Sequence, residues 1–254
     1  MLDRAAAWYN HLMQRLVDGV RALGLRLTDP QIAAFELYYE ELVAWNHKFN
    51  LTAITDYEQV QIRHFLDSLS CLLATEVRQT LQRPDARAID VGTGAGFPGI
   101  PLKLVCPGLR LTLLEATGKK VRFVEHLVER LGLHRVTAVH ARAEELAHDP
   151  AHRASYDLAL TRAVAELPIV LEYSLPFCKV GALVTCQKGE AGAAEAWSAE
   201  KAISLLGGEL RRVVPVELPG LPQDRSLILV AKTSPTPERY PRRPGIPSKR
   251  PLGT

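Results

Sequence analysis

The chain has 254 residues, 47% of them hydrophobic, so it can bury a full core, and its length predicts one main domain with additions. Lys and Arg total 31 against 28 Asp and Glu, a net charge of +3 that excludes a polycationic body and leaves room only for local nucleic-acid contacts. The start resembles no signal peptide, no apolar run approaches the roughly 20 residues that span a bilayer, and the four cysteines form no Cys-x-x-Cys pair; we therefore expect a cytoplasmic protein with no membrane partner and reduced cysteines.

Helical patterns occupy the first part of the chain. Apolar residues recur at helical spacing from about residue 5 to residue 23 and again from Ile32 to Trp45. The second run follows Asp29-Pro30, which predicts an N-cap and a proline at the first helical position. Residues 45–55 indicate a loop, and residues 60–73 indicate a further helix. We expect an N-terminal helical extension over residues 1–80.

From residue 86 the pattern changes to short apolar runs separated by amphipathic segments. The runs predict buried parallel strands at residues 86–91, 109–115, 136–140, 156–161 and 182–187. The segments between them predict helical crossovers at residues 101–105, 121–131 and 167–177. This alternation predicts an α/β fold with a Rossmann-like, mostly parallel, doubly wound sheet.

The C-terminal part differs from this alternation. Residues 212–218 and 226–232 are strand-like and are joined by a Pro/Gly-containing connection, which predicts a hairpin and so an antiparallel strand. We assign residues 81–233 to the main domain. Residues 234–254 form a basic, proline-rich tail that cannot make a packed core on its own.

A glycine-rich loop follows the first predicted strand. Asp90 ends that strand, and Gly92, Gly94 and Gly96 come at every second position, so the backbone can turn tightly and approach a ligand. A tight turn without a ligand is the alternative interpretation. Phe97 stands where a dinucleotide-binding loop requires its third glycine, so NAD fits poorly and S-adenosylmethionine is the favoured cofactor.

Three further positions lie at predicted strand ends. Glu115 ends the second strand, where a carboxylate can accept hydrogen bonds from both ribose hydroxyls, although a surface acid would look the same. Ala143 and Glu144 follow the third strand and fit an adenine edge or simply the first turn of a helix. Arg162 follows the fourth strand, where it would bind the cofactor carboxylate, an RNA phosphate or a structural acid.

Two histidines have the spacing of metal ligands. His148 and His152 are four residues apart and would share one face of a helix, but no third ligand follows at a suitable spacing. We expect surface histidines and predict no metal.

Several stretches, in order along nearly the whole chain, resemble the RsmG (GidB) family of methyltransferases of the bacterial small-subunit ribosomal RNA. The most specific are Asn50-Leu-Thr-Ala53, Gly96-Phe-Pro-Gly-Ile-Pro101 and the proline-basic tail; the others are Arg63-His-Phe-Leu-Asp-Ser-Leu69, Gly118-Lys-Lys-Val-Arg-Phe123, Thr161-Arg-Ala163 and Lys188-Gly189. In place of Asp-Ser-x-x, which many relatives carry before the basic cluster, this chain has Glu115-Ala-Thr-Gly118.

The resemblance implies methylation at N7 of a guanine in the 530 loop of 16S rRNA (guanine 527), with S-adenosylmethionine as donor. It implies that Gly92 and Phe97 belong to the cofactor loop and that Arg162 stands at the junction of cofactor and substrate. It also assigns Glu115, Ala116 and Thr117 to the ribose side, and Ala143 and Glu144 to the adenine side.

A guanine N7 acceptor fits the lack of an obvious catalytic pair, because N7 carries a lone pair and no proton, so an in-line transfer needs no general base. We assign no certain catalytic residue and place Arg162 only at the junction of cofactor and substrate. RNA affinity should come from phosphate contacts of basic residues near the predicted site and in the tail. These are Lys119, Lys120, Arg122, Lys188, Arg239, Arg242, Arg243, Lys249 and Arg250, with Tyr240 available for base stacking.

Two other functions stay open from the sequence. One is a small-molecule methyltransferase, against which the basic tail argues. The other is an RNA-binding or ribosome-assembly protein with a vestigial pocket, against which the intact glycine loop and Glu115 argue. As partner we expect 16S rRNA, free, in the small subunit or in an assembly intermediate, bound by a monomer.

Overall fold

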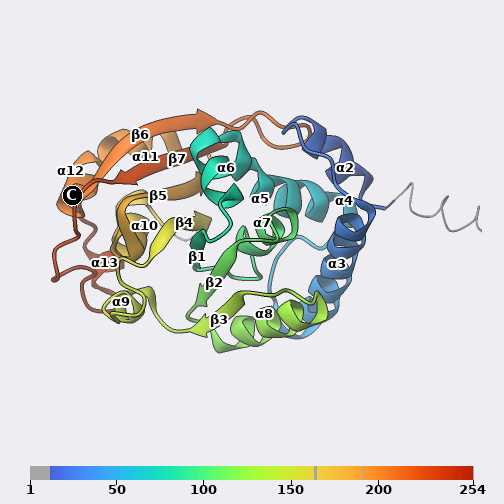
Figure 1. Cartoon of the computed structure of the whole chain (residues 1–254), viewed down its shortest axis with the longest axis horizontal. Coiled ribbons are helices and arrows are strands. Elements are labelled where there is room, and N and C mark those ends of the chain that lie inside the picture. The colour runs from blue at the N-terminus through green and yellow to red at the C-terminus, as the bar shows by residue number, and fades with distance from the viewer. Residues whose placement is uncertain (1–11, 163–164, 191, 254) are drawn as a thin grey trace, which may run out of the picture.

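A computed structural model describes residues 12–162, 165–190 and 192–253. Within these residues seven strands form one sheet in the order β3-β2-β1-β4-β5-β7-β6 (Figure 1). They are β1 (Arg87–Val91), β2 (Arg110–Glu115), β3 (Val136–His140), β4 (Tyr156–Arg162), β5 (Cys178–Lys188), β6 (Gly208–Pro215) and β7 (Ser226–Lys232). Strands β1 to β5 run parallel, and β7 is antiparallel to both β5 and β6. The predicted fold class and hairpin are confirmed.

Helices precede the sheet and connect its strands. Before β1 lie α2 (Gln14–Arg21), α3 (Asp29–Phe49), α4 (Tyr57–Val60), a π-helical turn (Gln61–Leu66), α5 (Asp67–Leu69), a 3₁₀ turn (Ser70–Leu73) and α6 (Thr75–Gln82). Between and after the strands lie α7 (Gly99–Val105), α8 (Gly118–Arg130), α9 (Ala143–Leu146), α10 (Leu167–Ser174), a 3₁₀ turn (Leu175–Phe177), α11 (Gly192–Ser198), α12 (Glu200–Leu205) and α13 (Ile246–Lys249).

Apolar side chains on alternate strand positions bury both faces of the sheet. Along β1, Ala88 belongs to one core cluster and Ile89 to the other. The first cluster joins one sheet face to α2, α3, α7 and α8, and the second joins the opposite face to α10, α11 and α12. This is the near-continuous burial expected of parallel strands covered on both sides. The N-terminal helices therefore share a core with the sheet.

The strand order creates the place where a ligand can bind. From β1 the chain moves outward to β2 and β3, and then returns to place β4 on the other side of β1. Connections leave neighbouring strands in opposite directions at this switch point, which opens a crevice at the carboxyl ends of the strands. The glycine loop after β1 and the ends of β2, β3 and β4 border this crevice.

The boundaries of α3 differ from the sequence prediction at both ends. Its N-cap is Thr28, whose backbone N–H donates to Gln31 Oε1 at 2.9 Å, so the prediction of Asp29 as the cap is wrong by one residue. The helix also continues to Phe49, because Trp45 packs against Phe49 and against Phe123 of α8. The predicted loop therefore starts at residue 50.

Strand bounds near the C-terminus also differ. β5 begins at Cys178 rather than residue 182, and its early residues 179–181 are exposed, so they leave no apolar run in the sequence. β6 covers Gly208–Pro215 rather than residues 212–218, because it is an edge strand with alternating exposure and charged side chains. The helices α11 and α12 between them were not predicted.

Two further sequence predictions concern the first helix of the chain and the lack of a membrane-spanning segment. Residues 5–11 of the first predicted helix lie outside the described residues, and its described part begins at Gln14. Among the described helices none has the length and apolarity to cross a membrane.

Candidate functional site

Asp90 holds the glycine loop by hydrogen bonds to both of its ends. Its carboxylate is fully buried, and Oδ2 accepts hydrogen bonds from Thr93 Oγ1 at 2.7 Å and from the Gly99 N–H at 2.8 Å. Burial raises the pKa of Asp90 to about 6, against the lowering effect of these bonds. The loop itself needs glycine, because φ is 73° at Gly92 and 61° at Gly94.

Glu115 at the end of β2 joins this loop to the next one. Its Oε2 accepts from the Gly94 N–H at 3.0 Å, and its Oε1 accepts from the Thr117 N–H at 2.8 Å. The side chain is buried to 8% exposure, yet it faces a cavity. Two backbone amides thus fix the carboxylate, and lone pairs remain for a ligand.

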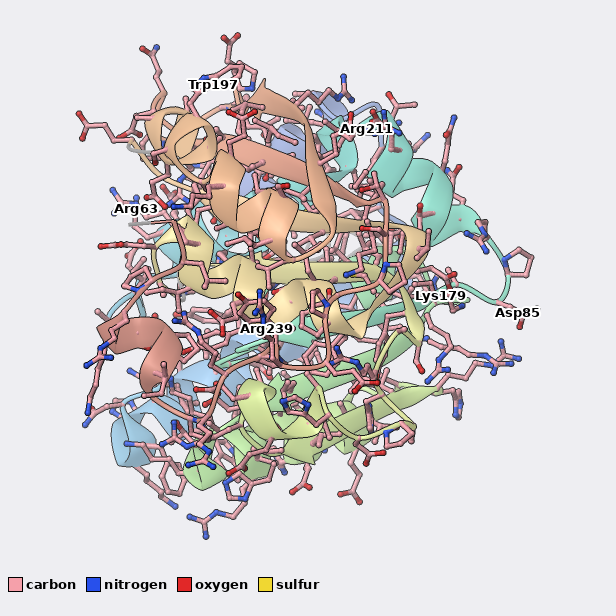
Figure 2. All side chains as sticks on the ribbon, turned by 90° about the vertical axis from the view of Figure 1, so that its left-hand side faces the viewer. Arg63, Asp85, Lys179, Trp197, Arg211 and Arg239 are labelled. Atoms are coloured by element: carbon pink, nitrogen blue, oxygen red, sulfur yellow. The ribbon has the colours of Figure 1, made fainter. Side chains whose placement is uncertain are left out.

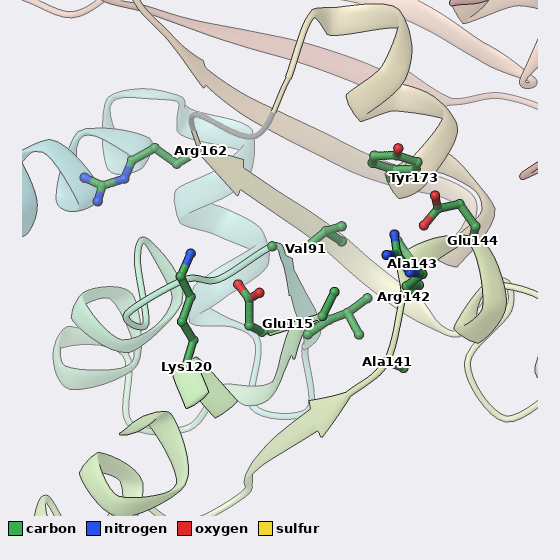
Figure 3. Close-up of a pocket in the computed structure, with 12 residues that line it drawn as sticks. Val91, Glu115, Lys120, Ala141, Arg142, Ala143, Glu144, Arg162 and Tyr173 are labelled. Atoms are coloured by element: carbon green, nitrogen blue, oxygen red, sulfur yellow. The ribbon is translucent and has the colours of Figure 1, made fainter. Parts of the chain in front are cut away.

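The cavity has a volume of about 320 Å³ and lies at the ends of β1, β2, β3 and β4 (Figure 3). Its lining includes seven residues singled out from the sequence, namely Gly92, Glu115, Ala116, Lys120, Ala143, Glu144 and Arg162. Lys120 had been predicted as an RNA contact. The lining is completed by five residues that the sequence did not predict, namely Val91, Leu114, Ala141, Arg142 and Tyr173.

The missed residues differ in how they could have been found. Val91 and Leu114 are the last or next-to-last residues of strands that end beside predicted site residues, so strand ends were a usable signal. Tyr173 reaches the cavity from α10, far along the chain, and no sequence pattern pointed to it. The predicted Asp90, Gly94, Gly96, Phe97 and Thr117 lie in or beside the loops but are not part of this lining.

Phe97 lies in an aromatic stack rather than in the lining. Its ring is nearly parallel to that of Tyr38, at 5.2 Å between centroids, and stacks on the His64 imidazole at 4.6 Å. The Tyr38 hydroxyl donates to the Ala95 carbonyl at 2.6 Å. Side chains of the N-terminal helices therefore pack against the glycine loop and hydrogen-bond to it.

Arg162 has a structural partner. Its Nη1 lies 3.0 Å from Asp67 Oδ2 and donates to the Arg63 carbonyl at 3.1 Å, and its guanidinium lies 4.8 Å from the centre of the Phe97 ring. Figure 3 shows the side chain directed away from Glu115 and Tyr173, toward the N-terminal helices. The structural ion pair considered from the sequence is present, and Arg162 also borders the cavity.

The protonation state of His64 follows from its neighbours. Arg162 Nη2 lies 3.3 Å from Nδ1 and can only donate, so Nδ1 accepts and the Nε2–H donates to Thr52 Oγ1 at 2.8 Å. Burial and the charge of Arg162 lower the pKa of His64 to about 3. The imidazole is therefore neutral at physiological pH.

The residues predicted to bind RNA have different surroundings. Lys119, Arg122, Arg239, Arg243, Lys249 and Arg250 are exposed. Lys188 instead pairs with Glu195 at 2.7 Å, and Arg242 pairs with the fully buried Glu172. Tyr240, predicted to be available for stacking, is buried to 6% exposure. The RNA role of this set stays a prediction.

The histidine pair does not share a helical face. α9 ends at Leu146, and both histidines follow it in turns. His148 Nε2 bonds to the Pro241 carbonyl at 2.8 Å, and His152 Nδ1 bonds to the Tyr156 hydroxyl at 2.6 Å. The prediction of a common helix for these residues is wrong, and each ring has a protein partner.

Comparison with known proteins gives consistent matches over most of the chain. The family model described as "GidB: rRNA small subunit methyltransferase G" matches residues 31–227. A relative from Dehalococcoides mccartyi (strain CBDB1), named ribosomal RNA small subunit methyltransferase G, is 47% identical over 94% of this chain and 100% of its own. A relative of the same name from Alkaliphilus metalliredigens is 45% identical over 93% of this chain and 97% of its own.

Solved structures share the fold at low sequence identity. A mutant of MtNAS in complex with S-adenosylmethionine aligns with a TM-score of 0.52 at 17% identity, over 81% of this chain and 77% of that one. A putative O-methyltransferase from Klebsiella pneumoniae aligns with a TM-score of 0.53 at 17% identity, over 78% of this chain and 90% of that one.

Proposed function

Because the chain belongs to the GidB family of rRNA small subunit methyltransferase G, we propose that it transfers a methyl group from S-adenosylmethionine to N7 of a guanine in the 530 loop of 16S rRNA. The observation that carries the proposal is the cavity at the ends of β1, β2, β3 and β4, in whose wall two backbone amides fix Glu115. The family model matches residues 31–227, which include this cavity.

The residues around the cavity fit the proposed cofactor. A Cβ at Gly94 would meet nothing nearer than the Gly92 carbonyl at 4.0 Å, so the loop leaves open space in which a ligand can lie against the backbone. Glu115 would accept hydrogen bonds from ribose hydroxyls, and Glu144 and Tyr173 would flank the adenine. When bound, S-adenosylmethionine supplies an electrophilic methyl group on its sulfonium.

Methylation at guanine N7 requires no general base from the protein. Guanine N7 has an in-plane lone pair and no proton, so the chain has to position the base rather than deprotonate it. A free cation beside N7 would oppose the positive charge that develops on the methylated ring. Asp67 offsets the charge of Arg162 at 3.0 Å, which makes Arg162 compatible with a place at this junction.

RNA would approach the edge of the cavity over exposed cations. Lys119 and Arg122 on α8 and the exposed basic residues of the tail would supply phosphate contacts. RNA recognition favours unpaired bases that can be splayed out, which agrees with a loop guanine. We expect a cytoplasmic monomer acting on 16S rRNA, free or in the small subunit.

A base analogue tests the acceptor atom directly. The protein is incubated with labelled S-adenosylmethionine and two versions of an RNA hairpin carrying the 530 loop, one with guanine and one with 7-deazaguanine at the target position. The analogue keeps the Watson–Crick edge and lacks N7, so we expect label only in the guanine hairpin. Equal labelling of both hairpins would exclude N7 as acceptor.

The other functions left open by the sequence have their own outcomes in this assay. Label in a metabolite extract but not in either hairpin, nor in assembled small subunits, would indicate a small-molecule methyltransferase. RNA binding without any cofactor binding in calorimetry would indicate an assembly protein with a vestigial pocket.

A further inference from the structure

The C-terminal tail folds back over the molecule after β7 and lies against α9 and α10 (Figure 2). Tyr240 belongs to the core cluster on that face of the sheet. Arg153 donates to the carbonyls of Thr236 and Tyr240 at 2.9 and 3.0 Å, and His148 bonds to that of Pro241. The tail is thus packed and hydrogen-bonded, although its composition predicts no core of its own.

Arg242 and Glu172 form an ion pair, the clamp, that holds the tail against α10, the helix that carries Tyr173. Its Nε and Nη2 donate to the two oxygens of Glu172 at 2.9 and 2.6 Å, and its backbone N–H donates to Glu172 Oε1 at 2.8 Å. Glu172 is fully buried, and the bond raises the pKa of Arg242. The same guanidinium donates to the Arg250 carbonyl at 2.8 Å, which closes residues 242–250 into a loop. Bidentate pairs of this kind fix geometry as well as adding energy.

The closed loop contacts two residues that line the cavity. The Gly245 N–H donates to Glu144 Oε1 at 3.1 Å, and Ser248 Oγ lies 3.0 Å from the Tyr173 hydroxyl. Glu144 and Tyr173 face each other across one end of the cavity (Figure 3). Burial, with the charge of Glu144 as a smaller cause, raises the pKa of Tyr173. The tail therefore contacts the side chains of both Glu144 and Tyr173 at this end of the cavity.

We propose that residues 242–248 are a positioning element of the cofactor site, with Arg242 as its anchor. The loop fixes Glu144 and Tyr173 before the adenine end of the cofactor binds, so less conformational freedom is lost on binding. This inference rests on the proposed function. It gives Arg242 a role in cofactor affinity, whereas its charge alone had suggested an RNA contact.

Neighbouring arginines provide a matched test. Arg242→Ala removes the clamp, and Arg243→Ala removes an exposed charge from the next residue, whose side chain is not in the clamp. In calorimetric titrations with S-adenosylhomocysteine we expect the Kd to rise about tenfold for Arg242→Ala and to stay within about twofold for Arg243→Ala. In turnover assays the KM for S-adenosylmethionine should rise for Arg242→Ala while kcat changes little.

A milder variant covers the case in which Arg242→Ala fails to fold. Ser248 is exposed, and Ser248→Ala removes only the bond to the Tyr173 hydroxyl, for which we expect a Kd increase of about threefold. Ligand binding should in turn stabilise the tail loop. S-adenosylhomocysteine should therefore slow amide hydrogen exchange at Gly245, although that residue is not part of the cavity lining.

The results separate failure of the inference from failure of the proposed function. If the wild-type chain binds the cofactor and folded Arg242→Ala and Ser248→Ala bind it equally well, the positioning role is wrong. Equal weakening by Arg242→Ala and Arg243→Ala would also overturn it, because a general charge effect would then explain both. If the wild-type chain binds no cofactor, the proposed function and this inference fail together.

Discussion

Two glycines of the loop have positive φ for different reasons. Gly94 has φ of 61° and open space around its absent Cβ, whereas a Cβ at Gly96, with φ of 99°, would lie 2.6 Å from the Tyr38 hydroxyl and from Ile100 Cδ1. Under the proposed function the open space at Gly94 would receive the cofactor, whereas Gly96 lets α3 pack against the loop.

Alanine at each position should separate these two roles. In both variants the left-handed backbone should lower the free energy of unfolding by about 1–2 kcal/mol. Overpacking should lower it by about 1–3 kcal/mol more in Gly96→Ala. We expect Gly94→Ala to weaken S-adenosylhomocysteine binding with the smaller loss of stability, measured by calorimetry and by thermal unfolding. If Gly94→Ala binds the cofactor as the wild type does, the loop does not hold it.

His64 should make folding stability depend on pH. Its pKa is about 3 in the folded protein, against an ordinary value of 6.5, so between these values the unfolded chain binds a proton that the folded chain does not. The free energy of unfolding should therefore fall as the pH drops from about 6.5 toward 3. The share of this one site is at most about 1.4 kcal/mol per pH unit.

The variant His64→Gln isolates this effect, because Gln keeps a donor for Thr52 and an acceptor for Arg162. Urea unfolding at pH 7 and pH 5 should show a larger loss of stability on acidification for the wild type than for the variant. Equal losses would mean that the His64 imidazole is protonated in the folded protein.

At the scale of elements, Asp67 fixes the N-terminal helices to the sheet. Its side chain is 3% exposed, and the carboxylate pairs with Arg162 at the end of β4 and with Arg225 just before β7, each at 3.0 Å. Gln187 of β5 also donates to the Asp67 carbonyl. One short helix, α5, is therefore bonded to two strands, β4 and β5, and to the residue that precedes β7.

Removing this carboxylate should cost far more than removing a surface one. Asp67→Ala leaves two largely buried guanidinium groups without their partner, a loss of about 3 kcal/mol or more. Glu58→Ala breaks an ion pair with Arg15 in which both side chains are more than half exposed, for which we expect less than about 1 kcal/mol. Denaturant midpoints measure both, and similar losses would contradict a structural role for Asp67.

What could be predicted at this scale depended on how local the signal was. Short apolar runs predict buried parallel strands and regular glycine spacing predicts the loop, so β1 to β4 and Glu115 can be predicted from local sequence. The last turn of α3 depends on Trp45 packing against Phe123, and the exposed beginnings of β5 and β6 leave no apolar pattern. Tyr173 and the tail reach the cavity only through tertiary folding.

At the scale of the whole molecule, the net charge of +3 leaves RNA affinity to a few exposed cations. Lys119→Ala should weaken RNA binding and reduce the slope of log K against log salt by about one, because one phosphate contact is lost. Lys188 pairs with Glu195 and its side chain is 11% exposed, so Lys188→Ala should change that slope less. Filter binding at several salt concentrations measures this, and an unchanged slope for Lys119→Ala would place the RNA on another face.

Under the proposed function, this fold and its cavity serve methylation of one ribosomal guanine. The most direct measurement is mass mapping of 16S rRNA after reaction with the purified chain and S-adenosylmethionine, with unreacted rRNA and rRNA in small subunits in parallel. We expect one new methyl group, on the base of a single guanine in the 530 loop. A methyl group on ribose, on another base or at many guanines, or none in either form of the rRNA, would exclude the proposed function.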